Sequence, residues 1–226
     1  SLTRKDIGND RKKIKSIKLY NLYSYEEYNK IVELHSKFYE ENKHALILGY
    51  LTKMQQSASG FEFDDNLESF MYIDNGRCNC LGNLVKNIKG KIVIYFKYTA
   101  ESIQIQSLYP KAKILKGGIL QKEFDKTLDK FNNSNDKIII IQQSVSVGFE
   151  LNVDTVIYYS TTFDLIVRNQ SEDRACIDNG KPLNIIDIVA ENTIDERIQD
   201  VINLKSNICL TFKKELDASK SRCKTI

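Results

Sequence analysis

An amide and a guanidinium lie four residues apart in the segment Gln-Ser-Glu-Asp-Arg at 170–174. Residues at i and i+4 of a helix share one face, so Gln170 and Arg174 are predicted to lie side by side. The planar fork of an arginine at the exposed end of such a helix can hold a phosphate through two hydrogen bonds. The alternative is an intrahelical or surface ion pair, which contributes only about 0.3–0.5 kcal/mol. These residues alone leave both interpretations open.

A second group of polar residues follows the most hydrophobic run of the chain, Ile138–Ile141. Residues 142–152 read QQSVSVGFELN and combine amides and hydroxyls with one glycine, Gly148. A glycine allows the backbone to approach a ligand closely, so this loop is a candidate contact for a phosphate or a sugar.

The sequence lacks the common catalytic and metal-binding patterns. It contains no G-x-x-x-x-G-K-[ST], G-x-S-x-G or H-E-x-x-H segment. Cys78 and Cys80 do not have the spacing of a zinc or redox pair, and His35 and His44 have no clustered acidic partner. We therefore predict no metal site and no self-sufficient catalytic centre.

The elements that must position these residues follow a regular alternation. Short apolar runs without polar alternation, typical of strands buried on both faces, occur at 91–96, 112–115, 138–141, 155–159 and 184–189. Helical patterns occur at 100–108, 121–131, 165–176 and 193–204. This alternation predicts an α/β fold of three layers (αβα), in which a mainly parallel sheet lies between two layers of helices. Ligands of such sheets bind at the carboxyl ends of the strands, so the loops that follow the five strands are the ones to inspect.

The first 89 residues have a different pattern. Residues 1–23 are basic and predict only a short extended segment, whereas Ser24 is a candidate N-cap for an amphipathic helix. Further helices are predicted at 45–58 and 78–88, and residues 60–76 read as a loop with room for one short strand. The expected organisation is a helical linker or appendage at 1–89, the α/β domain at 90–207 and a basic tail at 208–226.

Composition limits the class of protein. The 226 residues are 42% hydrophobic and 28% charged, which supports a packed core and excludes a disordered or fibrous chain. No apolar run reaches the roughly 18 residues of a membrane span, and the charged N-terminus lacks a secretory signal. The five scattered cysteines favour reduced thiols. We expect a soluble, cytoplasmic protein without a membrane partner.

The net charge of +3 is unevenly distributed, with an excess of basic side chains at the two ends of the sequence and an excess of acidic ones between them. Residues 1–20 carry seven basic and two acidic side chains, and residues 205–226 carry six basic and two acidic ones. Basic ends can hold a polyanion, because each neutralised phosphate releases counterions. They can equally be solvated tails.

The order of the segments resembles the second RecA-like lobe of Swi/Snf-like superfamily-two helicases, of a phage or bacterial type. GKIVIYFKY at 90–98 resembles motif four of that family, and the stretch from Ile138 to Asp164 resembles motif five and the strand after it. QSEDR at 170–174 and NTIDERI at 192–198 resemble motif six and the closing helix, and they are the most specific parts. The resemblance covers about residues 17–207.

The resemblance implies a function that two lobes share. A first, N-terminal lobe would carry the phosphate-binding loop and bind most of ATP and Mg²⁺, and this chain alone would bind neither. The second lobe would close over ATP and couple its hydrolysis to DNA translocation or remodelling, and it would be inactive without its partner lobe. DNA is the expected nucleic-acid partner, and the sequence does not distinguish it from RNA.

The resemblance also implies roles for particular residues, carried over by position. Gln170 and Arg174 are expected to be the catalytic residues at the nucleotide cleft. The residues expected beside the cofactor are Gly148, Glu150 and Lys181. Those expected to contact nucleic acid are Lys97, Tyr98 and Thr99 in motif four and Gln143, Ser144 and Ser146 in motif five.

Three departures from the family pattern favour an alternative function. Ile177 occupies the position of the second motif-six arginine, and the segment after it is one residue longer than usual. Phe124 replaces an arginine, and Glu150 brings a negative charge toward a phosphate site. The alternative is a degenerate helicase lobe that binds nucleic acid or protein without ATPase activity. A third interpretation, an unrelated α/β nucleotide-binding domain, requires QSEDR and NTIDERI to coincide by chance.

Overall fold

The computed structural model describes residues 11–41, 47–64, 68–146, 148–175, 177 and 179–204. The chain forms two compact units. The first, here called the lobe, comprises residues 1–20 and 76–189, and the second, here called the helical unit, comprises residues 21–75 and 190–226. This division differs from the predicted ranges 1–89, 90–207 and 208–226, because segments on both sides of residue 90 build the lobe. The tail at 208–226 lies outside the described residues.

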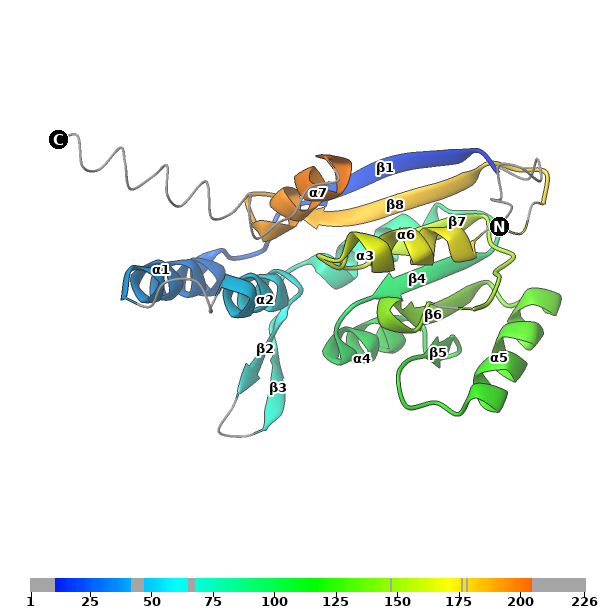
Figure 1. Cartoon of the computed structure of the whole chain (residues 1–226), viewed down its shortest axis with the longest axis horizontal. Coiled ribbons are helices and arrows are strands. Elements are labelled where there is room, and N and C mark those ends of the chain that lie inside the picture. Colours follow the sequence, from blue (N-terminus) through cyan, green and yellow to red (C-terminus); the bar gives the residue numbers. More distant parts are fainter. Residues whose placement is uncertain are drawn as a thin grey trace. The chain divides into compact units, whose positions relative to one another are not determined.

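The lobe is built on a six-stranded sheet with the strand order β1-β8-β7-β4-β6-β5 (Figure 1). Its strands are β1 (Lys13–Tyr20), β4 (Ile92–Phe96), β5 (Lys113–Leu115), β6 (Ile138–Gln142), β7 (Thr155–Tyr158) and β8 (Leu183–Ala190). The pairs β4–β6, β4–β7, β5–β6 and β7–β8 are all parallel. The predicted α/β class and the mainly parallel sheet are therefore confirmed.

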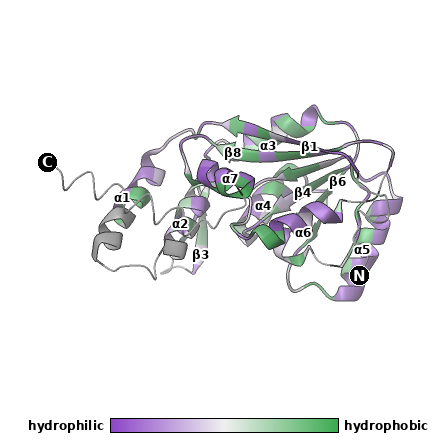
Figure 2. Ribbon diagram, turned by 45° about the horizontal axis from the view of Figure 1, so that its top comes forward, coloured by the Kyte–Doolittle hydropathy of each residue, from purple (hydrophilic) through white to green (hydrophobic). Residues whose placement is uncertain are grey.

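Helices cover both faces of this sheet and complete the three layers. Alternate residues of each central strand enter different cores, so that Val93 packs with α5 (Gln121–Asn133) and Ile94 packs with α3 (Arg77–Lys86) and α4 (Thr99–Leu108). Because both faces are covered, the strands are continuous apolar runs in the sequence. Helix α5 carries hydrophilic and hydrophobic residues in turn, as Figure 2 shows, and it buries only the face with Phe124, Leu128 and Phe131.

Strand β1 lies beside β8 at the edge of the sheet, whereas the sequence predicted only an extended segment within an appendage. The amide of Leu183 donates to the carbonyl of Lys12, which joins the first residues of the two strands (2.8 Å). The side chains of β1 are exposed except at Tyr20, which is half-buried. An edge strand of this kind carries no hydrophobic alternation, and its pairing with β8 spans most of the chain. Local sequence patterns therefore do not place it in the sheet.

The helical unit contains α1 (Glu26–Glu41), α2 (Ile47–Ala58), the hairpin β2 (Phe61–Asp64) and β3 (Ser69–Tyr72), and α7 (Ile194–Leu204). The hydroxyl of Ser24 accepts a hydrogen bond from the amide of Glu26, but α1 begins at Glu26, so Tyr25 and not the predicted Ser24 holds the N-cap position. The amide of Ile194 donates to the buried hydroxyl of Tyr28 at 2.6 Å and ties α7 to α1. The antiparallel hairpin replaces the predicted loop. None of the helices in the described ranges is long and apolar enough to cross a membrane.

Candidate functional site

The first group of candidate residues lies where β4 ends and α4 begins. The amides of Lys97 and Tyr98 both donate to one carboxylate oxygen of Glu101, each at 2.9 Å. The hydroxyl of Ser160 donates to the same oxygen at 2.7 Å. Glu101 is fully buried, so this carboxylate fixes the turn at 97–99 against the end of β7. The turn that resembles motif four is therefore rigid at its base.

The ammonium group of Lys97 lies between two aromatic rings. It is 3.5 Å from the ring centroid of Phe163 and 4.6 Å from that of Tyr98. A cation over an aromatic face is attracted by the ring's quadrupole, by about 0.5–1 kcal/mol at an accessible site. Phe163 was not predicted as a site residue. Its only signal in the sequence is its place directly before Asp164, the N-cap of α6 (Leu165–Arg174).

The side chains of Gln142 and Gln143 connect neighbouring loops at this edge of the sheet. Gln142 accepts from the amide of Gly117 (3.1 Å) and donates to the carbonyl of Lys97 (3.2 Å). Gln143 is buried, donates to the carbonyl of Ser160 (2.7 Å) and accepts from the amide of Thr162 (3.0 Å). These bonds join the loops after β4, β5, β6 and β7, which we call the carboxyl-edge loops.

The carboxyl-edge loops bring the six predicted nucleic-acid residues into one region of the lobe, with different exposures. Ser144 is exposed, Lys97 is half-buried, and Ser146 is almost fully buried. The buried amide of Gln143 is directed toward the loops that it joins, so any influence on a ligand passes through them.

The second group lies along the segment that returns from the end of β6 to the start of β7. This return segment, residues 148–154, buries Phe149, Leu151 and Val153 in the core, whereas Gly148 and Glu150 are exposed. The side-chain amide of Asn132 donates to the carbonyl of Glu150 and accepts from the amide of Asn152, both at 3.0 Å. Helix α5 thus pairs with the return segment as a neighbouring strand would.

Arg174 holds the other side of the return segment. Its carbonyl accepts from the amide of Leu151 at 2.7 Å, and its guanidinium donates to the carbonyls of Phe149 and Gln170, each at 3.2 Å. The predicted proximity of Gln170 and Arg174 is therefore present, although Gln170 contributes its main-chain oxygen. Arg174 is half-buried, and its remaining N–H groups have no acceptor within the described residues.

The two groups lie at opposite ends of α6. Phe163 and the N-cap Asp164, whose carboxylate accepts from the amides of Ile166 and Val167, lie at the start of the helix with the carboxyl-edge loops. Arg174 is the last helical residue, and a rise of 1.5 Å per residue separates the two ends by roughly 14 Å. The candidate nucleic-acid residues and the candidate phosphate residues therefore form two separate clusters.

Lys181, the third residue expected beside a cofactor, has a neighbour of opposite charge. Its side chain is 72% exposed, and its ammonium nitrogen is 3.8 Å from a carboxylate oxygen of Asp154. The other carboxylate oxygen of Asp154 accepts from the amide of Lys91 at 2.8 Å. A Cβ atom on Gly90 would lie 2.2 Å from this carboxylate, and the φ angle of Gly90 is +87°, so the close approach requires a glycine.

The middle of the QSEDR segment belongs to the core. Ser171 lies 2.6 Å from the hydroxyl of Tyr158, and Glu172 accepts at 2.9 Å from Arg168, whose side chain is 1% exposed. Arg168 also donates to Asp187 at 2.9 Å and lies over the ring of Tyr158. Burial alone would raise the pKa of Glu172, but Arg168 and Lys15 hold this pKa below its usual value. Ser171 and Glu172 in the QSEDR segment therefore stabilise the core, whereas a contact with phosphate is predicted only for the residues at the two ends of the segment.

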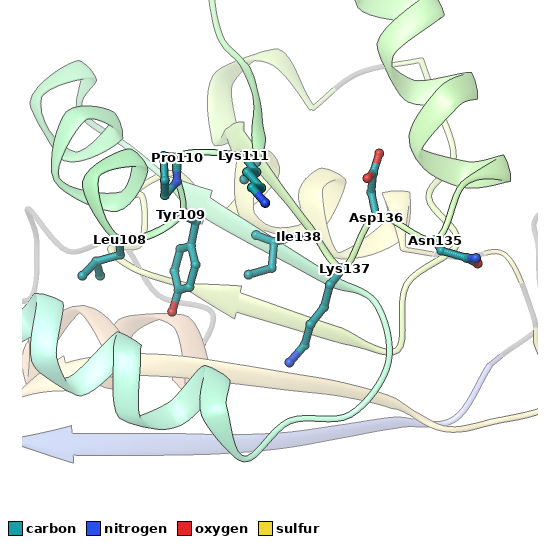
Figure 3. Close-up of a pocket in the computed structure, with 9 residues that line it drawn as sticks. Leu108, Tyr109, Pro110, Lys111, Asn135, Asp136, Lys137 and Ile138 are labelled. Carbon is teal, nitrogen blue, oxygen red and sulfur yellow. The ribbon is translucent and has the colours of Figure 1, made fainter.

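A pocket of about 480 Å³ opens at the amino edge of the sheet, and Figure 3 shows the residues that line it. It is lined by the turn from α4 to β5 and the start of β6, with Leu108, Tyr109, Lys111 and Lys137 among the lining residues. Burial raises the pKa of Tyr109 to about 12, so this phenol stays protonated at neutral pH. None of the predicted site residues lies in this pocket.

The chemistry of the described residues fits a phosphate contact better than a metal site. Within the described ranges, no three His, Cys, Asp or Glu side chains are grouped so that they could hold a metal ion. Arg174 and Lys181 are two of the cations near the return segment, and a guanidinium suits a phosphate oxygen.

The sheet, its two helical layers and the two clusters define a RecA-like α/β lobe. Residues 76–176 match the family model described as the helicase conserved C-terminal domain, and this range contains both clusters except Lys181. The chain is 25% identical over 211 residues to the uncharacterized ATP-dependent helicase MG018 of Mycoplasma genitalium, covering 80% of this chain and 20% of the relative. It is 23% identical over 155 residues to the ATP-dependent helicase fft2 of Schizosaccharomyces pombe, covering 64% of this chain and 12% of the relative.

Solved structures agree on the fold. The C-terminal part of the Fun30 ATPase domain matches with a TM-score of 0.66 at 16% identity, covering 85% of this chain and 89% of that one. The Sulfolobus solfataricus SWI2/SNF2 ATPase core in complex with dsDNA matches with a TM-score of 0.66 at 18% identity, covering 85% of this chain and 44% of that one. Residues 76–176 thus match a helicase C-terminal domain, and the chain has the RecA-like fold seen in the C-terminal lobes of SWI2/SNF2 ATPases, so the predicted resemblance to such a lobe is confirmed.

Proposed function

We propose that this chain is the second lobe of a DNA-dependent ATPase that couples ATP hydrolysis to translocation along DNA or to remodelling. A first lobe would bind most of ATP and Mg²⁺, and the chain alone would hydrolyse no ATP. The observation that carries this proposal is the helicase C-terminal match over residues 76–176, which spans the carboxyl-edge loops and the Arg174 end of α6. The chain spans only 20% and 12% of the two curated relatives, so the activity of a whole protein is inferred here from a part.

In this proposal Arg174 assists at the phosphates. A fixed positive charge stabilises the negative charge that develops as a phosphoryl group is transferred. The position of Arg174 supports this role, because main-chain carbonyls hold its guanidinium at the end of a helix and leave N–H groups for a ligand. Gln170 would keep the geometry of the cleft, and Gly148, Glu150 and Lys181 would border it.

The carboxyl-edge loops would contact the nucleic acid. Lys97 supplies a cation, Thr99 and the exposed Ser144 supply hydroxyls, and Tyr98 and Phe163 supply aromatic surface around the cation. Gln143 and Ser146 would shape the motif-five loop from within. One similar structure was solved with dsDNA, which makes double-stranded DNA the first substrate to test and RNA the second.

The test of the Arg174 role is phosphate release by the full-length protein at saturating ATP and DNA. Arg174→Ala should lower kcat by at least tenfold, because one tenfold step in rate corresponds to only about 1.4 kcal/mol of lost transition-state stabilisation. Lys122→Ala removes one exposed positive charge from α5 and should leave kcat unchanged. Magnesium-dependent ATPase activity of the isolated chain that Arg174→Ala abolishes would contradict the two-lobe proposal.

The second candidate is a binding module without nucleotide chemistry. Ile177 in place of the second motif-six arginine favours it, as do the exposed Glu150 on the return segment and Phe124. The ring centroids of Phe124 and Phe149 lie 5.5 Å apart in the core. Phe124 therefore contributes to packing, and folding does not need an arginine at this position. Ile177→Arg should raise the activity of a working two-lobed motor, whereas a pure module would show no change.

We also propose that the protein acts in the cytoplasm of a bacterial or phage-infected cell. The support is the lysine- and asparagine-rich composition together with the five scattered cysteines, which favour reduced thiols. Fractionation of the source cells would test this location directly.

A further inference from the structure

Arg11 lies next to the part of motif six where this chain departs from its family. It is 8% exposed, and its guanidinium donates to the carbonyls of Lys181 and Val153, each at 2.7 Å, and of Ile177 at 3.2 Å. A fourth bond joins it to the side-chain oxygen of Asn179 at 2.9 Å. An arginine from the start of the chain therefore holds the described residues 177 and 179–181, which we call the exit turn of α6.

The side chain of Asn179 also connects the exit turn to the amino edge of the sheet. The side-chain oxygen of Asn179 also accepts from the amide of Lys181 at 3.2 Å. The side-chain nitrogen of Asn179 donates to Asp154 at 3.1 Å, and Asp154 accepts from the amide of Lys91. The contacts of Arg11 thus extend through Asn179 to the first residues of β4 and β7.

Arg11 and Arg174 hold the return segment at its two ends. Arg174 binds the carbonyl of Phe149 and the amide of Leu151, while Arg11 binds the carbonyl of Val153. The exit turn follows helix α6 closely in the chain, since Ile177 comes three residues after Arg174, the last residue of α6. If the Arg11 contacts were lost, the carbonyls of Val153, Ile177 and Lys181 would lose these donors, whereas the return segment would keep its bonds to Arg174, Asn132 and Lys91.

We propose that Arg11 is a positioning residue for the phosphate end of this lobe: by clamping the exit turn onto the start of β7, it holds Arg174 in place. This inference rests on the proposed function. Arg11 does not supply the missing motif-six charge to a phosphate, because these four bonds of its guanidinium go to oxygen atoms of the protein. Its charge instead satisfies three main-chain carbonyls that would otherwise be left without these donors.

An arginine suits this position for a geometric reason. A guanidinium directs its donors in a fixed plane and can reach several oxygens at once, whereas a lysine offers a single compact ammonium. Arg11→Lys therefore keeps the charge and loses most of the clamp. Asn179→Ala loosens the clamp from the other side and leaves Arg11 intact, so the inference does not depend on one variant folding.

The experiment uses the full-length protein and measures amide hydrogen exchange over residues 177–184 together with DNA-stimulated phosphate release. Lys12→Ala is the matched control, because Lys12 is the exposed neighbour of Arg11 and only its main chain bonds to Leu183. Arg11→Lys and Asn179→Ala should each accelerate exchange in this segment and lower kcat at least fivefold. The KM for ATP should stay within twofold, because the first lobe would bind most of ATP. The Kd for DNA should also stay within twofold, because the carboxyl-edge loops are untouched.

A merely structural Arg11 would give a different result. Exchange would rise while kcat of the folded fraction stayed at the level of Lys12→Ala, and this would overturn the inference. Unchanged exchange in both variants would also overturn it, since the clamp would then not hold the turn. Failure of the proposed function is distinguishable, because the unmodified protein would itself release no phosphate, and the positioning role would fall with it.

Discussion

At the scale of single residues, charge has two different uses in this lobe. Arg168, Asp187 and Glu172 form a buried ionic group, whereas Lys97 keeps its ammonium at an accessible edge between two aromatic rings. Removing one member of a buried ionic group leaves an uncompensated charge and is costly, while an accessible charge contributes little to folding. Stability and ligand binding should therefore respond to different substitutions.

Glu172→Gln should lower the free energy of unfolding by about 3 kcal/mol at neutral pH, because Arg168 loses one of its buried carboxylates. The folded-state pKa of Glu172 is depressed, so its stabilisation is present at neutral pH and is lost as the pH falls below 4.5 and through the folded pKa. Denaturant unfolding at several pH values should give a flatter acid limb for Glu172→Gln than for the unmodified protein. Asp173→Asn alters a neighbouring carboxylate that is 54% exposed, and it should change stability by less than about 1 kcal/mol.

Lys97→Ala should weaken DNA binding and reduce the slope of log K against log salt by about 1, as expected for the loss of one phosphate contact. Lys111→Ala makes the same charge change at the amino edge of the sheet and should leave the slope unchanged. Binding titrations over a range of salt concentrations measure both. Equal slopes for the two variants would place the DNA away from the carboxyl-edge loops.

At the scale of elements, backbone geometry fixes the starts of the central strands. Gly90 has a left-handed φ angle and lies against Asp154, which in turn joins β4, β7 and Asn179. A second glycine, Gly82, lies within helix α3. A Cβ atom added there would meet no neighbouring side chain or adjoining element within 4 Å. The same substitution should therefore have opposite effects at the two positions.

Gly90→Ala should destabilise the protein by about 1–3 kcal/mol, because the added Cβ requires a strained backbone and displaces Asp154. Gly82→Ala should be neutral or stabilise by roughly 0.5–1 kcal/mol through helix propensity. Chemical denaturation of both variants provides the comparison. A neutral Gly90→Ala would mean that the contact between residue 90 and Asp154 is dispensable.

How much of the fold could be predicted depended on whether its signal was local. The buried strand β6 and the amphipathic helix α5 were predicted within two residues, because burial on both faces and a 3.6-residue period are written in adjacent residues. Strand β1 was predicted only as an extended segment, because its partner β8 lies about 170 residues further on. The hairpin β2–β3 lies in a stretch rich in Asp and Asn, which favoured a loop.

The site was predictable to the same extent. Gln170 and Arg174 both lie in α6 at the predicted i, i+4 spacing, but the contact of Arg174 with Phe149 depends on how the return segment crosses the lobe. Phe163 and Arg11 were missed because each acts on residues that are distant in sequence. No local pattern could have linked Arg11 to a turn near residue 179.

At the scale of the whole molecule, the proposed motor needs a second lobe beside this one. The described residues provide an arginine at a helix end and a cationic edge, and no metal-binding group of three within the described ranges. Hydrolysis and DNA tracking are thus expected to depend on the assembled protein. The clusters at the two ends of α6 would allow this helix to connect nucleotide state with DNA contact.

The most direct test of the central claim is phosphate release by the full-length protein, with and without double-stranded DNA. We predict release that DNA stimulates several-fold, together with no release by the isolated chain of residues 1–226. Retained DNA binding without any phosphate release would contradict the motor and favour a binding platform.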